Sequence, residues 1–123
     1  MSAEAKGLYL LPDPGRLVRR LEAEGWRIVE IDRPLPDRRA LMAALAEALA
    51  LPDYLGGGYD ALFDVLTDRL ALGGVPRLLL LLRDWQGFAA ADPASFLRFV
   101  ELLLDAGRFW RAREGDMRLC LQD

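Results

Sequence analysis

The chain has 123 residues, 53% of them hydrophobic and 28% charged, a composition typical of a single globular domain and not of a disordered chain. It contains no histidine and one cysteine, which excludes Ser-His-Asp and Cys-His catalysis, histidine metal ligation and an internal disulfide. The formal net charge is −3, but residues 40–70 hold five acids and one base, whereas the remaining residues are almost neutral. The acidic segment favours a basic partner there and argues against direct binding of nucleic acid.

Several further classes of protein are disfavoured. No stretch reaches the roughly 18 apolar residues of a membrane span. The first residues lack the apolar region of a secretory signal, and one cysteine suits a reducing compartment. We therefore expect a cytoplasmic protein that binds no membrane, metal or cofactor.

In chain order, residues 1–6 suggest a tail and residues 7–11 a short strand. The turn signal at 12–15 is followed by a short helix whose apolar face is Leu17, Val18 and Leu21. Gly25 ends this helix. The alternating, β-branched run at 26–31 predicts another strand. We predict two parts: residues 1–25 as an N-terminal extension, and residues 26–123 as the main domain.

The remainder alternates helices with strands. Asp37 caps a helix over 38–50, and a second helix follows the glycine loop, to about Leu72. The apolar run at 77–82 is typical of a central strand covered on both faces. A helix begins after Asp92 and runs to about Ala106, and residues 117–121 form a last strand. This order predicts an α/β fold with a short parallel sheet.

The second helix carries an acidic stripe. Asp60, Asp64 and Asp68 recur every four residues, opposite the apolar face, with Phe63 at the border. Like charges at this spacing cost a few tenths of a kcal/mol. A plain solvated face is one explanation. Because aromatic residues such as Tyr54 and Phe63 are typical interface anchors, we favour a partner-binding surface.

Catalytic interpretations of the same segment are weaker. The triple glycine at 56–58 lacks the lysine and the Ser/Thr of a phosphate loop. Asp60 and Asp64 alone do not define an acid/base pair. Cys120 lies in a predicted strand and suits a small buried apolar position. We predict no enzyme and no catalytic residue.

Two consecutive motifs resemble the barstar family of ribonuclease inhibitors. They are Leu-Pro-Asp-Tyr-x-Gly at 51–56 and Asp-Ala-Leu-x-Asp-x-Leu-Thr at 60–67. The resemblance extends from about Trp26 to Leu121. It implies a three-stranded parallel sheet packed by helices, and an intracellular inhibitor that occludes the basic active-site cleft of a ribonuclease.

The resemblance also implies the partner-binding residues. Asp60 and Asp64 match two family aspartates that face the cationic phosphate-binding groups of the ribonuclease, and Tyr54 matches a contact tyrosine. The complete predicted set is Tyr54, Gly56, Gly57, Gly58, Tyr59, Asp60, Phe63, Asp64 and Asp68.

The chain also departs from the family pattern. Phe63 replaces a tryptophan, and three glycines stand where the family has one glycine followed by polar residues. A contact glutamate on the last helix falls at Leu102, with Glu101 one position away, and the sequence leaves that choice open. These departures motivate an alternative, in which the chain is an interaction module of the same fold whose partner is not a nuclease.

Overall fold

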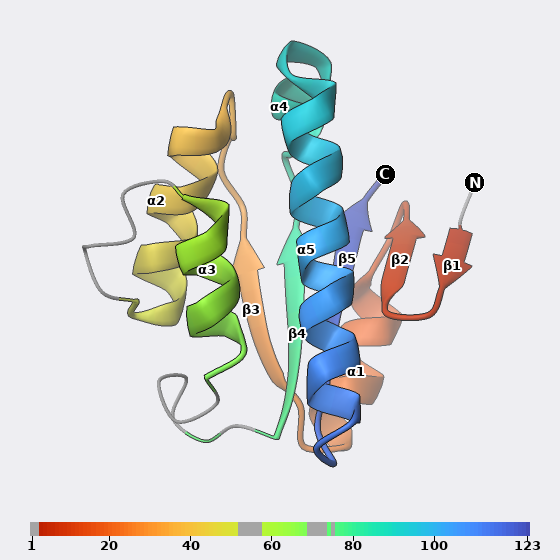
Figure 1. Ribbon diagram of the computed structural model, residues 1–123. Coiled ribbons are helices and arrows are strands. Elements are labelled where there is room, and N and C mark those ends of the chain that lie inside the picture. Colours follow the sequence, from red (N-terminus) through yellow and green to blue (C-terminus); the bar gives the residue numbers. More distant parts are fainter. Residues whose placement is uncertain (1–2, 52–57, 69–73, 75) are drawn as a thin grey trace.

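A β-sheet with four parallel strands lies at the centre of the molecule (Figure 1). The computed structural model describes residues 3–51, 58–68, 74 and 76–123. Across the described sheet the strands lie in the order β1 (Ala3–Ala5), β2 (Leu8–Leu11), β5 (Asp116–Gln122), β4 (Arg77–Leu82) and β3 (Arg27–Ile31). The last four are parallel to one another, and β1 is antiparallel to β2 at the edge. The predicted α/β class with a parallel sheet is confirmed.

The predicted number of parallel strands is wrong by one. β2 lies in the predicted N-terminal extension and pairs in parallel with β5, with Leu8 opposite Leu119 and Leu11 opposite Gln122. β1 also lies within residues that we predicted to be a tail. The extension therefore continues the sheet. The division into two parts at residue 25 remains a prediction.

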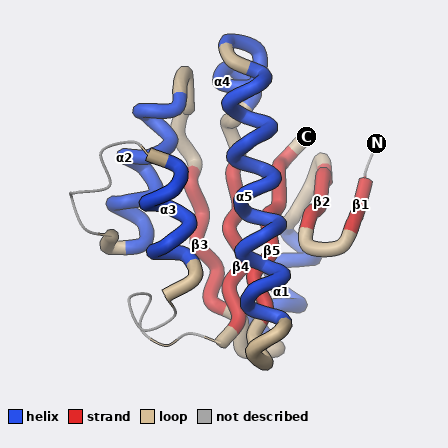
Figure 2. Tube along the Cα trace, in the orientation of Figure 1, coloured by secondary structure: helices blue, strands red, loops and turns tan. Residues whose placement is uncertain are grey.

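Helices cover both faces of this sheet, with α5 in front of the strands and α1 behind them (Figures 1 and 2). The helices of the described chain are α1 (Gly15–Ala23), α2 (Arg38–Leu49), α3 (Tyr59–Leu66), α4 (Gln86–Ala91) and α5 (Pro93–Arg111). None of these helices combines the length and the hydropathy that a membrane crossing requires.

The strand β4 is covered on both faces, as predicted. Because successive side chains of a strand point to opposite faces, its leucines divide between two cores. Leu78, Leu80 and Leu82 belong to the larger core, which α2, α3, α4 and α5 complete. Leu79 and Leu81 belong to the smaller core on the side of α1, with Tyr9, Leu17, Leu21, Trp26 and Cys120. Cys120 is fully buried, as expected for a small apolar residue.

The capping signals predict where two helices begin. The carboxylate of Asp37 accepts a hydrogen bond from the Ala40 amide at 2.8 Å, which caps α2. The carboxylate of Asp92 accepts one from the Ser95 amide at 3.1 Å, and Pro93 is the first residue of α5. Both predicted starts are confirmed.

The predicted end of α5 is wrong. The helix continues through Gly107 to Arg111. A Cβ atom at Gly107 would lie 2.6 Å from the carbonyl oxygen of Met117 in β5. Glycine is therefore required by a close approach of helix and strand, which a sequence pattern cannot distinguish from a helix stop.

The helix α3 is shorter than predicted within the described residues. It ends at Leu66, and the hydroxyl of Thr67 donates a hydrogen bond to the Phe63 carbonyl at 2.8 Å. Such local bonds are typical where a helix terminates. The remainder of the predicted helix, residues 69–72, lies outside the described residues.

Candidate functional site

The two faces of α3 separate as its periodicity predicts. Leu62, Val65 and Leu66 are buried in the larger core. Asp60 and Asp64 are exposed on the other side. The α3 carboxylates therefore stand on a helix whose apolar face is fixed by packing.

Both ends of α3 are bonded to α5. At the start, the Tyr59 hydroxyl lies 3.0 Å from both the carbonyl oxygen and the Oγ of Ser95. At the end, the indole N–H of Trp110 donates to the Leu66 carbonyl at 2.7 Å, in the buried interior. The last carbonyls of a helix lack partners within the helix, so this bond satisfies one of them. These bonds hold α3 against α5 at both of its ends.

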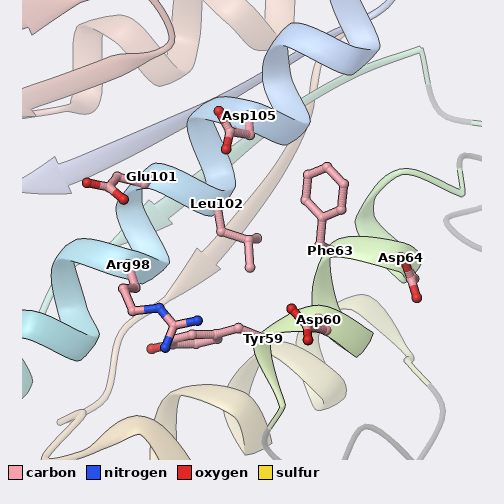
Figure 3. A pocket seen from close by; sticks show the side chains of 8 residues that line it. All are labelled: Tyr59, Asp60, Phe63, Asp64, Arg98, Glu101, Leu102 and Asp105. Atoms are coloured by element: carbon pink, nitrogen blue, oxygen red, sulfur yellow. The ribbon is translucent and has the colours of Figure 1, made fainter.

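A groove of about 420 Å³ lies between these two helices (Figure 3). Phe63 of α3 and Leu102 of α5, both half-buried, provide its apolar middle. The residues that line the groove are Tyr59, Asp60, Phe63, Asp64, Arg98, Glu101, Leu102 and Asp105.

Negative charge dominates this groove. Each helix contributes two exposed carboxylates separated by one helical turn, Asp60 with Asp64 and Glu101 with Asp105. Among the lining residues, the positive charge is that of Arg98, whose guanidinium lies 5.8 Å from the centre of the Tyr59 ring. An open recess with four carboxylates and one cation attracts cationic groups.

One of these carboxylates has an ion pair. Asp105 contacts Arg108, one turn further along α5, and both side chains are more than half exposed. Exposed pairs of this kind contribute little. Within the described part of the chain, Asp60, Asp64 and Glu101 form no ion pair and are available to a partner.

The predicted contact residues have different positions. Asp60, Phe63 and Asp64 line the groove, and Gly58 is the exposed residue before α3. Asp68 is exposed beyond the end of α3 and does not line the groove. Tyr54, Gly56 and Gly57 lie outside the described residues.

Tyr59 lines the groove but presents little surface. It is 6% exposed, and its ring packs near Phe99. Burial raises the pKa of its hydroxyl, although the hydrogen bond with Ser95 acts in the opposite direction. Its contacts show how Tyr59 anchors α3, and its part in partner binding remains a prediction.

Four groove residues, all on α5, were absent from the predicted set: Arg98, Glu101, Leu102 and Asp105. Glu101 and Asp105 form a narrow polar stripe on an otherwise apolar helix, and the sequence does not show that this stripe faces Asp60. Glu101 and Leu102 both line the groove, and which of them contacts a partner stays open. The signal that could have identified Glu101 and Asp105 is their spacing of four residues, the same as in α3.

The groove is lined by carboxylates, one arginine and apolar or aromatic side chains, and no serine, threonine, cysteine or histidine is among its lining residues. Among the described residues, no group of three or more His, Cys, Asp or Glu side chains is arranged to hold a metal ion. A groove with an apolar middle and charged borders has the composition of a protein interface. The described surface therefore fits a cationic protein partner.

Comparison with known proteins agrees with this arrangement. The family model described as Barstar (barnase inhibitor) matches residues 26–122, which include both helices of the groove. The comparison with curated proteins finds no significant match. Since the matched segment covers most of the chain, the protein belongs to the Barstar (barnase inhibitor) family.

Proposed function

We propose that this protein inhibits a ribonuclease by placing the groove between α3 and α5 over the cationic active-site cleft of that enzyme. The observation that carries the proposal is the convergence of four carboxylates from two helices on one groove, in a chain of the barnase-inhibitor family. A ribonuclease must bind phosphates, so its cleft offers the complementary charge. Inhibition then consists of exclusion: while the carboxylates occupy the cleft, RNA phosphates are kept out.

The two parts of the surface have different tasks in this proposal. The exposed carboxylates accelerate the encounter with a basic cleft, an effect that salt screens over a Debye length of about 8 Å at physiological ionic strength. Phe63 and Leu102 give the centre of the contact an apolar area from which water is expelled. We therefore expect the association rate to fall with salt more steeply than the dissociation rate rises.

The test is inhibition of RNA cleavage by a panel of basic microbial ribonucleases, together with variants that each remove one charge. We expect Asp64→Asn and Glu101→Gln each to weaken binding at least tenfold, or about 1.4 kcal/mol. Glu22→Gln is the matched control, because it removes one exposed negative charge from α1, on the other side of the sheet. Thermal unfolding of each variant verifies that the fold is retained.

Equal inhibition by the Asp64, Glu101 and Glu22 variants would contradict this site. If no ribonuclease is inhibited, and the same variants prevent binding of a different basic protein, the alternative of an interaction module with a non-nuclease partner replaces the proposal.

A further inference from the structure

A second recess lies on the other side of the sheet, between β2 and α1. It measures about 340 Å³ and is lined by Tyr9, Leu11, Arg16, Leu17 and Arg20. All five residues precede the segment that matches the family model. None of them takes part in the proposed inhibition, so any function of this recess would be separate from it.

The recess is positively charged. Arg16 and Arg20 are four residues apart on α1, so their side chains share one face of the helix. Both are exposed, and within the described residues neither side chain forms a hydrogen bond or an ion pair. Two unpaired guanidinium groups therefore border the same cavity.

Stability of α1 does not explain these charges. Like charges one turn apart destabilise a helix by a few tenths of a kcal/mol. Arg16 also lies in the first turn of α1, which contains no acid, and a cation there opposes the helix dipole. The Asp13 carboxylate, which accepts a hydrogen bond from the Gly15 amide at 3.0 Å at the start of α1, does not line the recess.

The floor of the recess is apolar and fixed. Leu17 and Tyr9 belong to the smaller core, and the Tyr9 hydroxyl accepts a hydrogen bond from Arg118. Leu11 is half-buried beside them. A ligand would thus meet a buried apolar wall and two exposed cationic side chains.

We propose that this recess binds a small phosphomonoester, whose phosphate accepts hydrogen bonds from Arg16 and Arg20 and whose ring lies against Leu11 and Leu17. Guanidinium groups match the geometry of phosphate, and two of them on one site favour a group that carries nearly two negative charges at pH 7. The volume lies at the lower end of the range of small-molecule sites, which suits a ligand of mononucleotide size.

The experiment is a titration of the ¹⁵N-labelled full chain with adenosine 5′-monophosphate, followed by NMR, with neutral adenosine as the comparison. We expect saturable shifts of the amides near Tyr9, Leu11 and residues 15–21, and none near Asp60. Arg16→Gln and Arg20→Gln each raise the Kd at least tenfold. Arg19→Gln removes the same charge from α1, at a residue that does not line the recess, and changes the Kd less than twofold.

Three results would overturn the site. The first is the absence of saturable shifts at adenosine 5′-monophosphate concentrations up to ~10 mM, a value that corresponds to almost no useful affinity. The second is binding of adenosine as tight as that of adenosine 5′-monophosphate. The third is a loss of affinity in Arg19→Gln as large as in Arg16→Gln and Arg20→Gln. The variant Asp64→Asn separates the two proposals. It should retain nucleotide binding, whether or not the groove on the other face inhibits a ribonuclease.

Discussion

Gly107 illustrates how a single residue depends on its tertiary contact. It lies inside α5, where a Cβ atom would meet the Met117 carbonyl at 2.6 Å. Gly87 lies inside α4, where the nearest atom to a Cβ is a backbone oxygen at 3.7 Å, an ordinary contact. The backbone atom that faces each glycine, and not the residue type, therefore decides what a methyl group would do there.

We therefore predict opposite effects of the same substitution. Gly107→Ala forces α5 away from β5 and should destabilise the protein by roughly 1–3 kcal/mol. Gly87→Ala should stabilise it by about 0.4–1 kcal/mol, because alanine restricts the unfolded chain. Urea unfolding of both variants measures the change in unfolding free energy. Equal changes in the two variants would contradict the close approach of α5 and β5 at Gly107.

Cys120 is the second case at this scale. Burial raises the pKa of its thiol to about 11, from an ordinary value of 9.0, and Arg83 opposes this shift weakly. The folded state therefore holds the proton more tightly than the unfolded state. The contribution of the protonated thiol to the unfolding free energy is complete below pH 9 and is lost as the pH rises from 9 to 11.

The prediction is a difference between two pH profiles. Between pH 8 and pH 11 the wild-type chain should lose roughly 2–3 kcal/mol more unfolding free energy than Cys120→Ala, which has no thiol to titrate. The comparison removes the contribution of Tyr59, whose pKa is also raised and which both proteins share. If the unfolding free energies of the wild-type chain and Cys120→Ala, measured with denaturant, fell in parallel with pH, a buried thiol would be contradicted.

At the scale of elements, the junction of α3 with α5 determines the shape of the groove. α3 has eight residues, too short to be stable alone, so its order depends on tertiary bonds. The bond from Trp110 to the Leu66 carbonyl is one of these. The apolar stripe of α3 could be predicted from the sequence, whereas its junction could not, because Trp110 is 44 residues away.

Trp110→Phe should loosen α3 while the sheet remains folded. The Leu66 carbonyl loses a buried partner, at a cost of about 1–3 kcal/mol. Amide hydrogen exchange should accelerate in α3 more than in β4. Trp85→Phe is the control, because the Trp85 indole also donates to a carbonyl, that of Gln122 in β5, at 2.9 Å. Faster exchange of α3 in both variants would contradict the proposed junction.

For the whole molecule, the N-terminal segment completes the second face of the sheet. Leu17 and Leu21 of α1 pack with Tyr9 on Leu79, Leu81 and Cys120. The side chain of Arg118 in β5 reinforces this contact, because it bonds to Tyr9 and lies 4.8 Å from the Trp26 ring. Without this cover, an apolar sheet face would meet water.

We expect removal of residues 1–25 to cause aggregation, measured by size-exclusion chromatography with light scattering. A milder variant keeps the prediction testable if the truncated chain does not fold. Leu21→Ala in the full chain should cost about 2–5 kcal/mol. Leu97→Ala, at a leucine that is 57% exposed, should cost less than about 0.5 kcal/mol. If the truncated protein were monomeric and as stable as the full chain, the sheet face in residues 26–123 would not need the N-terminal segment to cover it.

The sequence by itself determined those features that depend on neighbouring residues. The caps of α2 and α5, the apolar face of α3, the central strand β4 and the acidic stripe follow from local spacing, because helix and strand periods are properties of a short segment. The family follows from two motifs within twenty residues.

The tertiary structure alone decided which distant segments meet. It paired β2 with β5, carried α5 past Gly107, and brought Glu101 and Asp105 opposite Asp60. These outcomes depend on packing between segments far apart in the chain, on which local periodicity carries no information.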